Sequence, residues 1–107
     1  MTPRRWEPVT HSELADVSLD DVLHALADPA RRELVRILTT GGDRVCGTFE
    51  LDLAAPTLSH HFRILREACV ILQYDDGRKR MNTLRTSELD ERFPGLLKTI
   101  LANASRP

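Results

Sequence analysis

The chain has 107 residues, of which 41% are hydrophobic and 29% are charged. This length fits one domain, and this composition is typical of a folded globular protein rather than of a disordered chain. No apolar run approaches the roughly 18 residues that span a bilayer, and no apolar stretch follows the basic N-terminus as it does in a secretory signal. The sequence therefore predicts a cytoplasmic protein without membrane contact, whose two cysteines are free thiols.

Residues 1–17 are expected to form an N-terminal arm, because prolines oppose an early helix there. Residues 18–104 are expected to form the single domain. Ser18, followed by two acidic residues, predicts the start of a first helix. Asp28-Pro29 predicts the start of a second helix, since Asp is a good cap and Pro suits the first helical position. Gly41-Gly42 ends this helix.

The middle of the chain is expected to contain a short helix and then a longer one. Residues 45–53 are ambiguous, and we interpret them as a short extended piece followed by a short helix through Phe49 and Leu53. The next helix runs from about Pro56 to Ala68, because its apolar residues recur at spacings of four and three.

After this helix, the spacing of the apolar residues changes from the helical period of 3.6 residues to the two-residue alternation of a strand. This change predicts a β-hairpin with strands at residues 70–74 and 80–84. Residues 75–78 are expected to form its turn, with Asp-Gly at the centre. Ser87 predicts the start of a last helix, with a kink at Pro94-Gly95. The apolar stripe on this helix is long for so small a protein and suits a dimer interface.

The predicted fold is mainly α with a small β-hairpin, in the order α-α-α-α-β-β-α. This is the layout of a winged helix-turn-helix, in which one helix fits the DNA major groove and the hairpin reaches the backbone or the minor groove. The net charge of −1 is not typical of a DNA-binding protein. However, residues 57–85 carry six Arg or Lys and three acidic residues, a net charge of +3, against −4 in the remainder.

Seven polar or basic residues are the candidate DNA contacts. Those on the helix from Pro56 lie outside its apolar stripe, and their hydroxyl, imidazole and guanidinium groups can bond base edges or phosphates. Those in the hairpin are cations that suit the sugar-phosphate backbone. The seven residues are Thr57, Ser59, His60 and Arg63 on the helix, and Arg78, Lys79 and Arg80 in the hairpin. An ordinary solvated helix face is the alternative, but the basic hairpin that follows favours DNA.

Three segments resemble the ArsR/SmtB-type family of regulators, in that family's order and over residues 18–100. Leu26–Leu38 resembles its L-x-D-P-x-R-x-x-I-L-x-x-L opening, and Ala55–Ala68 resembles its Q-P-T-x-S-x-H-L-x-x-L-R-E-A recognition helix. Gly77–Arg80 resembles its wing. The resemblance implies a homodimer built from the first and last helices, a palindromic operator on double-stranded DNA, and repression relieved by a ligand.

The metal ligands usual in this family are missing. Many members carry a Cys-x-Cys pair where this chain has Cys46 alone, and residues 87–104, where others carry Asp and His ligands, contain no His. No cofactor is evident, and a metal ion is not supported by the usual ligand motifs. A metal site formed by His11, Glu13 and Asp16 is a minor alternative.

Three further residues depart from the family pattern. Ala54 and Ala55 replace the usual Ser and Gln, which predicts the loss of a side-chain helix cap, at a cost of about 1 kcal/mol, and of one base contact. Cys69 replaces a Gly that normally takes a left-handed conformation, so the helix either ends differently or tolerates strain. Two roles are compatible with Cys69 in the sequence: a small buried thiol that packs in the core, and a redox sensor.

The sequence thus favours a DNA-binding transcriptional regulator that acts as a repressor. The alternative is a winged-helix protein-interaction module whose effector is bound by a partner chain. An enzyme is not predicted, because the sequence contains neither a nucleophile–base pattern nor a Gly-rich phosphate loop nor a metal-ligand cluster.

Overall fold

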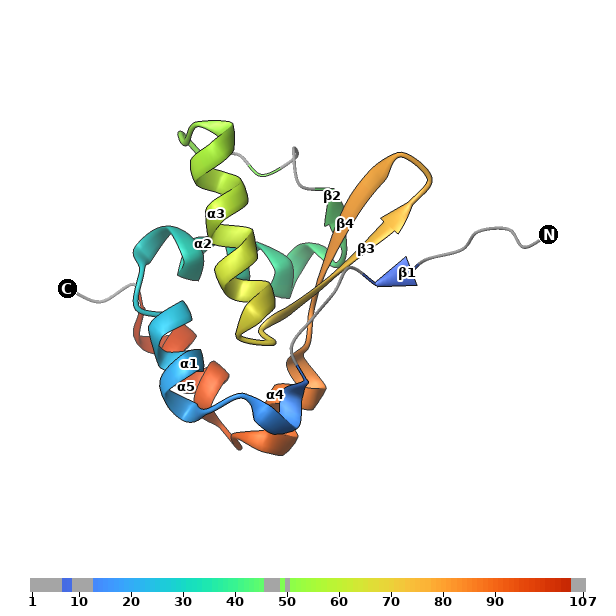
Figure 1. Ribbon diagram of the computed structural model, residues 1–107. Helices are drawn as coiled ribbons and strands as arrows, with labels where there is room; N and C mark the ends of the chain where they lie inside the picture. The colour runs from blue at the N-terminus through green and yellow to red at the C-terminus, as the bar shows by residue number, and fades with distance from the viewer. Residues whose placement is uncertain (1–6, 9–12, 46–48, 50, 105–107) are drawn as a thin grey trace.

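The computed structural model describes residues 7–8, 13–45, 49 and 51–104. Helices predominate, as predicted, and they accompany a small sheet (Figure 1). The elements in chain order are β1 (Glu7–Pro8), the 3-10 helix η1 (Leu14–Asp16), α1 (Leu19–Ala25), α2 (Pro29–Gly41), β2 (Arg44–Val45), α3 (Ala55–Glu67), β3 (Ile71–Asp76), β4 (Lys79–Leu84), α4 (Thr86–Arg92) and α5 (Leu96–Asn103).

The sheet is antiparallel, with the strand order β1-β3-β4-β2. Strands β3 and β4 form the predicted hairpin, which the two-residue strands β1 and β2 flank. The sheet is therefore wider than the hairpin expected from the sequence. Strand β1 belongs to the segment expected as an arm, and the boundary between arm and domain stays a prediction.

The hairpin turn is displaced from its predicted position. Asp75 and Asp76 belong to β3, and Asp76 pairs with Lys79, so the two turn residues are Gly77 and Arg78. Gly77 has φ 67°, and among the described non-glycine residues Cys69 alone has a positive φ. Glycine at the first central position, with a negative φ at the second, is the pattern of a type II′ turn. In the predicted turn, Asp76 would be a central residue and would need a positive φ, which is unfavourable for a non-glycine residue. In the observed register, Asp76 is a strand residue and this requirement disappears.

Local signals predicted the beginnings of α1 and α2 correctly. The Oγ atom of Ser18 accepts a hydrogen bond from the N–H of Asp21, and the Asp21 carboxylate accepts one from the N–H of Ser18, at 3.1 and 3.0 Å. This is a capping box. The Asp28 carboxylate accepts from two N–H groups in the first turn of α2, at 2.8 and 3.3 Å, and Pro29 is the first residue of that helix.

The short helix predicted before α3 is wrong for the residues that the structure describes. Phe49 and residues 51–54 are not helical, and Glu50 lies outside the described residues. The N–H of Leu53 bonds the carbonyl of Leu51 at 2.8 Å. This tight turn excludes an α-helix, whose N–H groups bond the carbonyl four residues earlier.

The predicted C-terminal helix is in fact two helices, and it begins at Thr86 rather than after a Ser87 cap. Pro94 disfavours helical backbone at the preceding Phe93, which has φ −133° and ψ 79°. Gly95 then takes φ 76° before α5 begins. The predicted kink is therefore a complete break, which divides the apolar stripe between α4 and α5.

Helix α3 ends with Cys69 in the position that glycine usually occupies. The N–H groups of Cys69 and Val70 bond the carbonyls of Arg66 and Leu65, at 3.0 and 2.9 Å, which is the Schellman pattern. Cys69 has φ 61°, so the helix end is kept and the strain, about 1 kcal/mol, is tolerated. The thiol is buried, and burial raises its pKa, with Arg85 opposing this effect.

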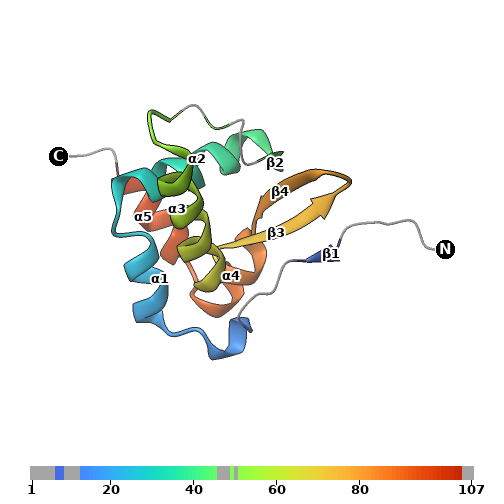
Figure 2. The same cartoon turned by 45° about the horizontal axis from the view of Figure 1, so that its top comes forward.

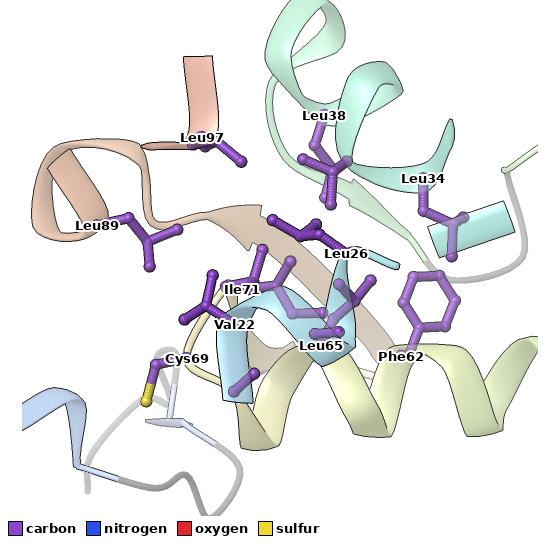
Figure 3. Close-up of a cluster of buried hydrophobic side chains, with 14 of the residues drawn as sticks. Val22, Leu26, Leu34, Leu38, Phe62, Leu65, Cys69, Ile71, Leu89 and Leu97 are labelled. Atoms are coloured by element: carbon purple, nitrogen blue, oxygen red, sulfur yellow. The ribbon is translucent and has the colours of Figure 1, made fainter. Parts of the chain in front are cut away.

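One hydrophobic core joins the helices to the base of the hairpin. Figure 3 shows its side chains converging from all of these elements. They include Val22 of α1 and Leu26 just after it, Leu34 and Leu38 of α2, Phe62 and Leu65 of α3, Ile71 of β3, Leu89 of α4 and Leu97 of α5. From this core the hairpin extends away from α1, α4 and α5 (Figures 1 and 2), and α3 packs against β3.

Candidate nucleic-acid interface

A groove of about 650 Å³ lies between α3 and the hairpin. It is lined by Pro56, Ser59, His60, Phe62, Arg63 and Arg66 of α3, together with Gln73 of β3 and Arg80 of β4. Four of the seven predicted DNA contacts thus surround one hollow, although they are up to 21 positions apart in the sequence. The fold thus brings helix and hairpin residues that are distant in the sequence to one surface.

The other three predicted contacts are exposed but lie outside this groove. Thr57 is in the first turn of α3, Arg78 is in the hairpin turn, and Lys79 begins β4. All seven predicted residues are therefore accessible in the single chain. They extend the polar surface from the groove to the start of α3 and to the hairpin tip.

Two of the groove arginines are paired with carboxylates. The Nε atom of Arg63 lies 3.5 Å from a carboxylate oxygen of Glu67, one helical turn further along α3. The Nε atom of Arg80 lies 2.6 Å from Oδ1 of Asp75 across the hairpin. All four side chains are more than two-fifths exposed, so both pairs are weak and screened by salt. A phosphate can therefore replace either carboxylate at little cost.

A chain of buried polar groups connects α3 to the sheet, and the sequence did not predict it. Arg66 Nη1 donates to Gln73 Oε1 at 2.8 Å, and Gln73 Nε2 donates to Asn82 Oδ1 at 2.8 Å. Asn82 Nδ2 in turn donates to the carbonyl of Arg44 at 3.2 Å. Gln73 and Asn82 are only 3% and 0% exposed. These hydrogen bonds fix α3 against the hairpin, because the buried amides that form them are paired with one another and with their neighbours.

One signal in the sequence could have revealed this chain. Gln73 follows Ile71 by two positions, so both point to the same face of the strand, and Ile71 is fully buried. A polar residue in this inward position needs a buried partner. Asn82, which is directly opposite Gln73 in the register, supplies it.

The start of α3 has the weakened cap that the sequence predicts. Ala54 is the N-cap residue, and its side chain makes no capping hydrogen bond to the N–H groups of the first turn. The exposed Ala55 begins the helix and Pro56 follows it. These N–H groups are therefore left to solvent or to a bound anion.

The described residues contain no cluster of metal ligands. In this part of the chain, no group of three or more His, Cys, Asp or Glu side chains is arranged to hold a metal ion. His11 of the alternative metal site and Cys46 lie outside the described residues. None of the described helices combines the length and the apolar character needed to cross a membrane.

Comparison with known proteins identifies the family. The model of the bacterial regulatory protein, arsR family, matches residues 28–70, which include α2 and α3. The transcriptional repressor SdpR of Bacillus subtilis is 31% identical over 84 residues, which are 77% of this chain and 92% of SdpR. The chain belongs to the ArsR family. The arsenical resistance operon repressor of Staphylococcus xylosus is 33% identical over 73 residues, which are 67% of this chain and 70% of that protein.

A solved structure supports the fold of this ArsR family member. The crystal structure of another ArsR family transcriptional regulator superposes with a TM-score of 0.63, covering 83% of this chain and 93% of that one, at 24% sequence identity. The predicted winged helix-turn-helix is therefore confirmed. Membership of the family also confirms the predicted class, a DNA-binding transcriptional regulator and not an enzyme.

Proposed function

We propose that this ArsR family regulator is a homodimeric repressor that acts in the cytoplasm on a palindromic operator. The observation that carries the proposal is the shared groove between α3 and the hairpin, which brings Ser59, His60 and Arg63 of α3 close to Arg80 of the hairpin. Repression is supported by two relatives, SdpR and the arsenical resistance operon repressor, that are named as repressors.

In this proposal, α3 is the recognition helix. Its exposed Thr57, Ser59, His60 and Arg63 contact base edges and phosphates in the major groove. The hairpin is the wing, and its exposed Arg78, Lys79 and Arg80 contact the sugar-phosphate backbone or the minor groove. Since Ala55 lacks a hydrogen-bonding side chain, no base is read at that position.

An exposed apolar surface on α1 supports the homodimer. Leu19 and Leu23, four positions apart on one face of α1, are 46% and 41% exposed and together form an apolar patch that a partner can cover. Beside Leu23, a hollow of about 400 Å³ is lined by residues that include Leu26, which follows α1, Arg32 of α2 and Ile100 of α5. In a two-fold dimer the same surface of a second copy covers these residues. Two recognition helices then reach major grooves one helical turn apart.

Selection of bound fragments from random duplex DNA by the purified protein tests the proposal. An inverted repeat should be enriched, its affinity should fall steeply with salt, and Leu23→Glu should convert the dimer to monomers in sedimentation. Lys98→Glu on α5, which changes an exposed charge outside the apolar surface, is the matched control. Weak binding that is equal for all sequences would instead favour the protein-interaction module.

A further inference from the structure

The three arginines of the groove differ in how their charge is balanced. Arg63 and Arg80 each face a carboxylate, that of Glu67 and that of Asp75 respectively. Within the part of the chain that the structure describes, Arg66 forms no ion pair. Its one hydrogen-bond partner there is the neutral amide of Gln73. The uncompensated positive charge of the groove therefore belongs to Arg66, which is not among the seven residues predicted from the sequence.

The side chain of Arg66 also holds an unused donor. Its Nε atom is buried and has no hydrogen-bond partner in the described structure. Burying a donor of a charged group without a partner is costly, and such groups call for an explanation in native proteins. The same guanidinium lines the groove in which DNA is proposed to lie, so a phosphate there can balance its charge, although Nε itself is closed to solvent.

The position of Arg66 is fixed before any ligand arrives. Gln73 accepts from Nη1, and Gln73 is itself held by Asn82, which is directly opposite it in the sheet. Arg66 also follows Ser59 by seven residues and Arg63 by three, so the three share one face of α3. A half-buried, preorganised guanidinium is screened less by water than an exposed one, and it loses less entropy when it binds.

We propose that Arg66 is a further DNA-binding residue, which binds a backbone phosphate of the operator in the groove. Gln73 and Asn82 position the Arg66 side chain for this contact. This inference rests on the proposed function. A phosphate is the matching ligand because a guanidinium offers it two parallel N–H donors and full charge compensation. It contributes affinity and register but reads no base.

Binding measurements at several salt concentrations test the role of Arg66. The probes are a synthetic duplex that carries the selected inverted repeat and a scrambled duplex of the same length. Arg66→Met should weaken binding to both duplexes alike, by about tenfold or more. The slope of log affinity against log salt should become shallower by about 0.9 for each phosphate that the variant no longer neutralises, hence by about 1.8 for a dimer.

Two further variants separate a phosphate contact from a structural role. Gln73→Met leaves the charge of Arg66 in place but removes its support, so affinity should fall a few-fold while the salt slope stays as in the wild type. Lys98→Met removes one exposed charge of α5, which does not line the groove, and should change neither the affinity nor the salt slope. A folded Arg66→Met protein that keeps the wild-type slope would overturn the inference.

The unmodified protein provides a second readout if Arg66→Met does not fold. The side-chain Nε–H signal of Arg66 should shift in NMR spectra when the operator duplex is added, whereas that of Arg92 on α4 should not. An unshifted Arg66 signal at saturating duplex overturns the inference and leaves the proposed function intact. Absence of duplex binding by the wild-type protein overturns both.

Discussion

Arg31 of α2 donates a hydrogen bond from Nη1 to Nδ1 of His61 on α3, over 3.2 Å, and both side chains are more than nine-tenths buried. A guanidinium can only donate, so Nδ1 of His61 accepts and the ring proton is on Nε2. Arg31 also donates to the carbonyls of Ala25 and His24, at 2.6 and 3.2 Å. One side chain thus joins the end of α1 to α3.

Replacing Arg31 is therefore expected to destabilise the whole domain. Arg31→Met leaves the buried Ala25 carbonyl and a buried imidazole nitrogen without the donor that Arg31 supplies, and it removes one of the hydrogen bonds of the His24 carbonyl, which should lower the free energy of unfolding by about 3 kcal/mol. Urea unfolding measures this change. The matched control is Arg36→Met on the same helix, where an exposed pair with Glu33 is removed at a cost below about 1 kcal/mol. Equal destabilisation of the two variants would contradict the role given to Arg31.

Restoring a cap at the start of α3 should stabilise the protein. Ala54 already has φ −64° and ψ 149°, the extended conformation that capping residues adopt. Ala54→Ser places a hydroxyl where it can accept from the first-turn N–H groups, and should raise the free energy of unfolding by about 1 kcal/mol. Ala102→Ser, the same change at an exposed position inside α5, should lower it by up to about 0.7 kcal/mol. A cap contribution would be refuted if both variants were destabilised alike.

Tyr74 provides a direct titration, because it is the single tyrosine of the chain. Its hydroxyl donates to Asp43 at 2.5 Å, and this hydrogen bond, together with burial, raises the pKa of Tyr74 to about 12. Since the ordinary value is about 10, this hydrogen bond stabilises the fold fully below about pH 10, and its contribution disappears as the pH rises through about 12. Tyrosinate absorbance should show this midpoint while circular dichroism reports the folded state.

The variant Asp43→Asn is the test of the cause of this pKa shift. It removes the carboxylate charge, so the tyrosinate midpoint should fall towards about 10. Asp52→Asn, which changes an exposed carboxylate away from Tyr74, should leave the midpoint unchanged. A midpoint that does not respond to Asp43→Asn would assign the shift to burial.

The thiol of Cys69 is expected to react slowly. It is fully buried and burial raises its pKa, so both access and the thiolate fraction are low. In a Cys46→Ser background, a thiol reagent should modify Cys69 slowly in buffer and rapidly in denaturant. Rapid modification of the folded protein would favour the redox-sensor interpretation over the buried thiol.

The helix and the wing are expected to differ in what they contribute to DNA binding. Arg63→Ala should weaken operator binding and relax its sequence preference, because Arg63 is a candidate base contact. Lys79→Ala should weaken all duplexes alike and make the salt slope shallower by about 0.9 for each phosphate that is no longer neutralised. Competition binding with operator and scrambled duplexes measures both effects. If Lys79→Ala changed the sequence preference more than Arg63→Ala, the two roles would have to be exchanged.

The sequence by itself determined the elements whose signals are local. The capping box at Ser18, the Asp28-Pro29 start of α2 and the period change after α3 each depend on residues within a few positions of one another. Such interactions are largely independent of the rest of the chain. The same holds for the family motifs, which predicted the fold and the class of protein.

Tertiary structure alone decided which side chains meet. The hairpin register moved the turn to Gly77-Arg78. The hydrogen bonds of Arg66 with Gln73 and of Arg31 with His61 join residues 7 and 30 positions apart. They exist because buried polar groups need partners, and only packing of α3 against the sheet and α2 determines which partners come within reach.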